Sequence, residues 1–177
     1  MRVAKIVLIV VLVIGLAVGS YALIYLHNQL NQIKTELQPV ELSTQDHVVI
    51  YLIKSTPTDF HLVPVHRQTK GPISPASALQ ALLNGPLAHE EFFESVPHNT
   101  RLLGLDVQGG LATANFSQEI VKDFNGGSLI ESYLVEAIVN TLTEFPDIDK
   151  VQILVEGGSV ESIGGHVLIS QPLRRTR

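Results

Sequence analysis

Residues 101–116 read RLLGLDVQGGLATANF and carry the clearest secondary-structure signal in the chain. Apolar residues alternate with other residues on both sides of Gly109-Gly110; they are Leu103, Leu105 and Val107 before the glycines and Ala112, Ala114 and Phe116 after them. A period of two is typical of a half-buried strand, and paired glycines supply the positive φ angles that tight hairpin turns need. The stretch therefore predicts an antiparallel β-hairpin.

A short helix is predicted before this hairpin. Ser74 is a typical N-cap residue, Pro75 suits the first helical position, and the sequence NGP at 84–86 is typical of a helix end. Four apolar residues between these signals have helical spacing and form one face: Ala78, Leu79, Leu82 and Leu83. The helix therefore begins at Pro75 and ends before residue 84.

Two strands are predicted before this helix. The sequence HVVIYLIK at 47–54 is a continuous run of β-branched and aliphatic residues, which is typical of a strand covered on both faces. The sequence FHLVPVHR at 60–67 follows a turn that contains Pro57. Because proline cannot donate a hydrogen bond to a ladder, Pro64 confines this second strand to the edge of a sheet.

A longer helix and two strands are predicted after the hairpin. Ser128 and Glu131 have the spacing of a capping box, and Pro146 ends the helix. The helix carries an apolar stripe that consists of Ile130, Leu134, Ala137, Ile138, Thr141, Leu142 and Phe145. Residues 151–156 and 166–170 are the last two predicted strands, with glycine pairs between them.

The resulting order of elements is ββαββαββ, which predicts an α+β fold. We expect a mixed β-sheet with two helices packed against it, in one domain over residues 46–173. The last residues, 174–177, form a basic tail with the sequence RRTR.

The N-terminal end of the chain is of a different kind. Residues 6–26 contain no charged residue and are dominated by Val, Leu and Ile. A helix of this length, at about 1.5 Å per residue, crosses a hydrocarbon core roughly 30 Å thick. Because Arg2 and Lys5 precede it, we expect cytoplasmic residues 1–5, a single-pass signal anchor at 6–26 in the cell membrane, and an extracytoplasmic C-terminal domain. The alternative is a cleaved signal peptide.

The segment 27–45 is predicted to be a stalk or linker. Leucine and isoleucine recur from residue 23 to residue 37 at spacings of three and four, as in a coiled-coil seam. This pattern spans barely two heptads. Two interpretations stay open, a seam through which the chain associates with itself and a polar helical stalk with a few apolar residues.

Composition and charge exclude several classes of function. The 177 residues contain no cysteine, which excludes disulfides, Cys-based zinc sites, a cysteine nucleophile and a lipidated cysteine. Beyond the anchor the chain has 17 acidic residues and ten basic ones. An acidic domain without a basic patch is a poor partner for nucleic acid, so we expect none.

No constellation of residues indicates catalysis. His61 and His66 are five residues apart on one strand, so they lie on opposite faces, and His89-Glu90 lacks the second histidine of a zinc-protease helix. There is also no nucleophile elbow, Walker loop or dinucleotide fingerprint. We therefore expect no catalytic residue, no metal and no cofactor.

Two carboxylate pairs and two short segments are the remaining candidates for chemistry. The pairs are Glu119 with Asp123 and Glu156 with Glu161; we interpret them as solvated surface, and a hydrolase that uses them is the minor alternative. The candidate contact residues for a ligand or partner are Phe92, Phe93, Gly126 and Gly127. The phenylalanines offer rings that can stack on sugars, and Gly126-Gly127 lies at a helix N-terminus, where backbone N–H groups attract anions.

The order of short motifs from residue 48 to residue 174 resembles the GerMN domain, the sporulation and spore-germination domain of bacterial envelope proteins. The matching pieces are VIYL at 49–52, LVPVHR at 62–67, ALQALLNGP at 78–86, PHNTRLL at 97–103, GLATANFS at 110–117, GSLIE at 127–131, IVNTLTEFP at 138–146, VQILVEG at 151–157 and GHVLISQPLR at 165–174. Matches in order over about 125 residues are far more specific than any single motif.

The resemblance implies a compact α+β module that assembles or binds other proteins outside the membrane and has no established catalytic activity. The family often has Asp where this chain has Asn115, so no recurrent carboxylate is carried over. The chain resembles one copy of the domain, whereas the sporulation proteins usually carry two copies and a lipid anchor.

Three functions are therefore weighed. The first is a non-enzymatic envelope protein that binds other envelope proteins or itself, with a role in sporulation or germination. The second is a peptidoglycan-binding or wall-remodelling accessory module. The third is a hydrolase that works through carboxylates.

Overall fold

The computed structural model describes residues 20, 25, 47–69 and 71–176. The chain divides into two compact units, Met1–Thr44 and Gln45–Arg177, and the strands and helices named below belong to the second. The predicted cytoplasmic end 1–5, the anchor 6–26 and the stalk 27–45 lie outside the described residues, apart from Ser20 and Tyr25. Within the described part of the chain, no helix has the length and hydropathy needed to span a membrane.

The first sheet is a hairpin of β1 (His47–Ser55) and β2 (Phe60–Gln68), paired antiparallel. β1 is buried over most of its length, as its continuous apolar sequence predicts, and Ile50 and Leu52 have no exposed surface. Pro64 lies opposite Tyr51 in β2, which is an edge strand of this sheet. Both strand predictions and the edge position of the proline are confirmed.

The second sheet has the order β3-β4-β5 and mixed pairing. β3 (Leu102–Gln108) and β4 (Leu111–Phe116) are antiparallel, and β5 (Lys150–Val155) runs parallel to β4. Gly109 and Gly110 form the predicted hairpin turn with φ angles of 55° and 81°, in the left-handed region that glycine adopts most readily.

Two helices connect and cover the sheets, with a single turn of helix between the strands of the second sheet. α2 (Pro75–Leu83) has the predicted N-cap Ser74, whose hydroxyl accepts from the backbone N–H of Ser77 at 3.1 Å. α4 (Ser128–Thr143) is the predicted long helix. α3 (Glu119–Lys122) is not predicted from the sequence, because one turn is too short to show a helical period.

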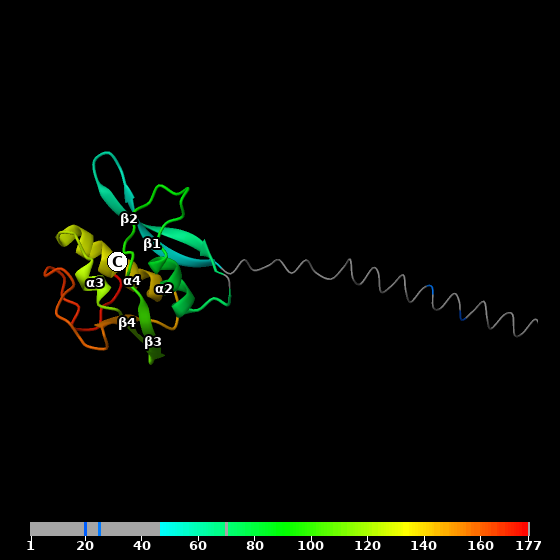
Figure 1. The fold of residues 1–177 in the computed structure, drawn as a ribbon. Helices are drawn as coiled ribbons and strands as arrows, with labels where there is room; N and C mark the ends of the chain where they lie inside the picture. The colour runs from blue at the N-terminus through cyan, green and yellow to red at the C-terminus, as the bar shows by residue number, and fades with distance from the viewer. Residues whose placement is uncertain (1–19, 21–24, 26–46, 70, 177) are drawn as a thin grey trace, which may run out of the picture. The chain divides into compact units, whose positions relative to one another are not determined.

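The prediction of one mixed sheet is wrong, because β1 and β2 do not join the other three strands. α4 contacts β1 and β5, and α2 contacts β1 and β3. The helices therefore lie between the two sheets, as Figure 1 shows, rather than on one face of a single sheet. At one end of β1, Phe93 pairs with Ile53 on the side opposite β2.

The predicted last strand at 166–170 is also wrong. Residues 156–172 form turns and irregular backbone, and Leu173 makes an isolated antiparallel bridge to Val151 of β5. The backbone N–H groups at 163, 164 and 166 donate to a side chain, that of Glu131, instead of to a neighbouring strand. One core is shared by both sheets and both long helices, with Phe116 as its largest fully buried side chain.

Candidate functional site

The two predicted aromatic contact residues face in different directions. Phe93 is fixed by its backbone, since its N–H donates to the carbonyl of Ile53 at 2.8 Å and its carbonyl accepts from Ile53 N–H at 3.3 Å. Its ring is 56% exposed. Phe92 is half-buried and packs against the core instead. Only Phe93 therefore presents a ring to a ligand or partner.

A second aromatic ring completes this surface. Phe60, the first residue of β2, lies edge-on to Phe93 with ring centroids 6.3 Å apart and an interplanar angle of 73°. Its ring is 39% exposed. The hydroxyl of Tyr133 on α4 donates to the carbonyl of Phe60 at 2.7 Å. We call Phe60 and Phe93 the aromatic pair; the sequence did not identify Phe60, because its nearness to Phe93 depends on tertiary contacts.

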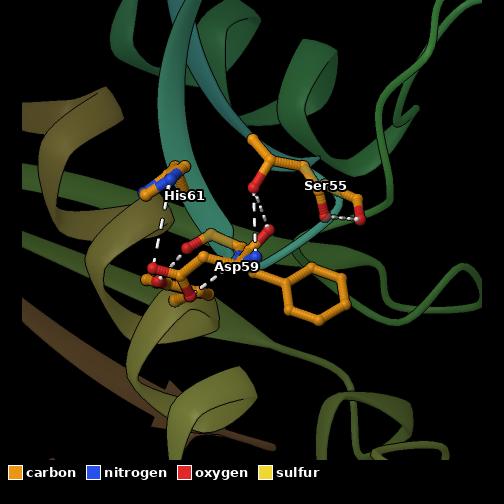
Figure 2. A network of polar contacts seen from close by, with 6 residues as sticks. Ser55, Asp59 and His61 are labelled. Atoms are coloured by element: carbon orange, nitrogen blue, oxygen red, sulfur yellow. Dashed lines mark hydrogen bonds and ion pairs between the residues drawn. The ribbon is translucent and has the colours of Figure 1, made fainter.

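The turn that precedes Phe60 is held by its own polar groups (Figure 2). Asp59 accepts a hydrogen bond from the backbone N–H of Phe60 at 2.8 Å, and its backbone N–H and carbonyl both bond to the hydroxyl of Thr56. His61 lies 4.0 Å from the Asp59 carboxylate. These contacts fix the start of β2, and with it the backbone that carries the Phe60 ring.

The loop that carries Phe93 is anchored at both ends. Arg67 of β2 makes a two-fold ion pair with Glu90, with nitrogen to oxygen distances of 3.0 and 2.8 Å, and Leu87 N–H also donates to that carboxylate. The hydrogen bonds from Arg67 hold the pKa of Glu90 below its usual value. On the other side of Phe93, the hydroxyl of Ser95 donates to the carbonyl of Tyr51 at 3.0 Å. The ring of Phe93 thus sits on a fixed backbone.

Gly126 and Gly127 occupy their positions for different structural reasons. A Cβ atom at Gly126 would lie 2.8 Å from the side chain of Ile130, so close packing requires glycine there. Gly127 is the N-cap of α4, with open space around its Cα. Residues of the neighbouring segment 123–134 and residues 94–97, which follow Phe93, line a shallow groove of about 180 Å³ that includes Glu94 and Asp123. The structure thus brings the two predicted segments to one groove, although none of the four predicted residues lines it.

The predicted capping box at Ser128 and Glu131 is wrong. The N-cap is Gly127, and no side chain caps the helix. Glu131 is fully buried, and its carboxylate accepts hydrogen bonds from the backbone N–H groups of Ile163, Gly164 and His166 and from Nδ1 of His166, all at 2.8 to 3.0 Å. Burial acts to raise the pKa of Glu131, but the hydrogen bonds outweigh it and lower the pKa.

Three of the four carboxylates that were candidates for catalysis, Glu119, Asp123 and Glu156, have structural contacts. Glu119 lies 3.4 Å from Arg101, and Glu156 accepts from the backbone N–H of Gln118 at 2.9 Å. Asp123 accepts from Asn99 at 2.8 Å. Asn115, which stands where the family often has Asp, accepts from the backbone N–H of Gly157 at 2.7 Å. These contacts tie loops to the second sheet.

Among the described residues, no group of three or more His, Asp or Glu side chains is placed to bind a metal ion. Three described histidines each lie beside one carboxylate: His61 lies 4.0 Å from Asp59, His98 lies 3.0 Å from Glu94, and His166 lies 2.9 Å from Glu131.

The family model for sporulation and spore germination, Germane, matches residues 49–161. The chain belongs to this GerMN family. The resemblance drawn from the short motifs is confirmed, and the matched range runs from β1 to the turn region after β5.

Solved structures share the fold. The first GerMN domain of the sporulation protein GerM from Bacillus subtilis has 28% identity and a TM-score of 0.59, and the alignment covers 73% of this chain and 97% of that one. The tandem GerMN domains of the same protein have 21% identity and a TM-score of 0.63, with 79% of this chain and 49% of that one covered. A protein from Clostridium perfringens assigned as a lipoprotein has 25% identity and a TM-score of 0.54, with 75% and 89% covered. No curated protein matches the chain in sequence.

Proposed function

We propose that this chain is a membrane-anchored, extracytoplasmic GerMN protein that binds another protein of the bacterial cell envelope through the aromatic pair and catalyses no reaction. The GerMN domain is linked to sporulation and germination, and the proposed role lies in one of these processes. The uncharged run at 6–26 and the likeness to a protein assigned as a lipoprotein support the membrane location.

The observation that carries this proposal is the fixed and exposed ring of Phe93. Two backbone hydrogen bonds to Ile53 hold the backbone that carries this ring, and the ring lies edge-on to that of Phe60. A large ring that is already ordered loses little entropy when a partner covers it, which is why aromatic residues dominate binding energy in interfaces. The candidate polar groups, in contrast, bond to neighbouring parts of the domain.

The proposal is tested by crosslinking in living cells. A tagged full-length chain is crosslinked, purified under denaturing conditions, and its adducts are identified by mass spectrometry. We expect an envelope protein that is recovered with the wild-type chain and lost with Phe93→Ala. Recovery that is equal for both chains, or the absence of any envelope protein, contradicts the proposal.

Peptidoglycan is the second candidate partner, because exposed aromatic rings also stack on sugars. The exposed pair Phe60 and Phe93 is the observation that favours it. Retention of the chain on purified sacculi separates the two functions. Glycan binding is supported if Phe93→Ala abolishes retention and Leu168→Ala preserves it. Leu168 is a matched control because it is also 56% exposed. No retention of the wild-type chain excludes it.

A further inference from the structure

The outer edge of β3 has no partner strand within the described part of the chain. β3 lies at the end of the order β3-β4-β5, and none of the isolated bridges involves it. Unpaired N–H and C=O groups along a strand form a template on which another strand can pair. The opposite edge of this sheet is different, because Leu173 bridges to Val151 of β5.

The hairpin geometry determines which residues of β3 present these groups. Gln108 and Leu111 flank the two-residue turn, so they form a hydrogen-bonded pair, and such pairs alternate from there as far as Gly104. The pairing with β4 is irregular between Leu102 and Gly104. By this alternation Asp106 and Gly104 direct their backbone groups towards β4. Leu105 and Val107 therefore direct their N–H and C=O groups outward.

We propose that two copies of this chain pair antiparallel through β3, with Leu105 opposite Leu105 of the second copy. Leu105 is the midpoint of β3, so this register pairs the regular stretch from Gly104 to Asp106 of one copy with the same stretch of the other. It also sets outward-facing backbone groups against each other, as an antiparallel ladder requires. The two three-stranded sheets become one six-stranded sheet related by a two-fold axis.

The side chains favour the second copy over an arbitrary strand. In this register Leu103, which is 47% exposed and lies at the irregularity, is the residue of β3 nearest to Val107 of the second copy, which is 39% exposed. Asp106 is the single charged residue of β3, and it lies opposite Gly104 of the second copy. Moving the register so that residue 106 becomes the centre sets two Asp106 carboxylates against each other, which is unfavourable. The sequence of β3 is thus complementary to itself in one register.

The absence of cysteine from the chain makes this register directly testable. Gly104→Cys and Asp106→Cys are made as separate full-length chains with tags of different size, purified in detergent, mixed and mildly oxidised. Residues 104 and 106 of opposite copies form a pair with Cα atoms about 4.5 Å apart, within disulfide range, whereas 104 with 104 and 106 with 106 are diagonal pairs about 7–8 Å apart.

We expect the mixture to give the mixed disulfide at least ten times faster than either chain alone gives its own disulfide. Leu168→Cys, at an exposed site elsewhere, measures collisions and any association through the N-terminal segment. Equal rates for the mixture, the single chains and the Leu168→Cys control overturn the proposal.

A second pair of variants changes residue 107 on the proposed contact edge of β3 and leaves the two cysteines in place. Val107→Lys, added to both cysteine chains, places a charge near Leu103 of the second copy and is expected to abolish the mixed disulfide. Val107→Thr keeps the β-branched shape and is expected to preserve it. Circular dichroism checks that both variants are folded, and a mixed disulfide that survives Val107→Lys overturns the proposal. Neither result depends on Phe93, so this proposal and the envelope-partner proposal fail separately.

Discussion

The buried carboxylate of Glu131 holds the backbone at residues 163–166. A buried carboxylate is costly unless hydrogen bonds compensate for lost water, and here four donors converge on it. The spacing of Ser128 and Glu131 indicated a local cap instead. That interpretation is wrong because the true donors lie 32 to 35 residues away in sequence, where a local motif carries no information.

Glu131→Gln is predicted to destabilise the domain. The amide has one acceptor oxygen and sets an N–H₂ group against backbone N–H donors, so we expect a loss of about 1.5–3 kcal/mol in the free energy of unfolding. Urea denaturation measures it. Glu136→Gln on the same helix is the control, and equal stability of the two variants would contradict the role given to Glu131.

The pH dependence of stability follows from the same carboxylate. Its pKa in the folded state is lowered from a starting value of 4.5, so folding favours the charged form. The stabilisation is therefore complete above about pH 4.5 and is lost as the pH falls through the folded-state pKa. We expect Glu131→Gln to lose less stability than wild type as the pH falls from 7 to about 3 in urea titrations, because the loss occurs below about pH 4.5. An equal loss would contradict the prediction.

At the scale of elements, the sequence correctly predicted those segments whose ends or turns carry proline, glycine or N-cap residues. Ser74 and Pro75 begin α2 as expected, the two glycines close the β3–β4 hairpin, and Pro64 lies on an edge strand. These signals are local, since each depends on the backbone preference of one or two residues. The segment 166–170 has the apolar composition of a strand, but the backbone N–H of its first residue, His166, bonds to Glu131 and the segment forms no strand.

The hairpin turn gives a prediction at this scale. Gly110 has φ of 81°, and an added Cβ would lie 3.0 Å from the carboxylate of Asp149. Gly110→Ala is therefore expected to cost about 1–2 kcal/mol of stability, as left-handed backbone does for residues with a side chain. Gly109→Asn is the control, because Asn tolerates φ of 55° and the site is open. Thermal unfolding compares them, and equal midpoints would be evidence against this turn geometry.

At the scale of the whole molecule, the C-terminal residues tie distant elements together. Arg175 lies over the ring of Tyr51 of β1, 5.3 Å from its centroid, and donates to the Tyr51 hydroxyl and to Glu144. The tail predicted at 174–177 thus contacts both β1 and the end of α4 through one residue. Charge alone marked these residues as a basic tail, because nothing local in the sequence indicates the contact.

Arg175→Ala is predicted to destabilise the domain modestly. Arg175 and Glu144 are both partly exposed, so solvent screens the ion pair and we expect a loss of about 0.5–1 kcal/mol. Arg174→Ala is the matched control, since Arg174 is exposed and next in sequence. Urea denaturation at low and high salt measures both. A loss that is no larger than that of the control would show that the contact does not stabilise the fold.

The sequence predicted only part of the candidate contact surface. The loop that carries Phe92 and Phe93 was predicted as the contact region, and Phe93 is indeed exposed there. Which of the two rings faces outward depends on the bridge to Ile53, and the second ring, Phe60, comes from another strand. In the same way, the division into two sheets depends on how the helices pack between them, which element order does not specify.

The most direct test of the account is photo-crosslinking at single positions in cells that express the full-length chain. A photoreactive amino acid is placed at position 93, and in a parallel chain at the equally exposed position 168. The account predicts an adduct with an envelope protein from position 93 and not from position 168. An envelope-protein adduct from position 168 alone, or none from position 93, would contradict it.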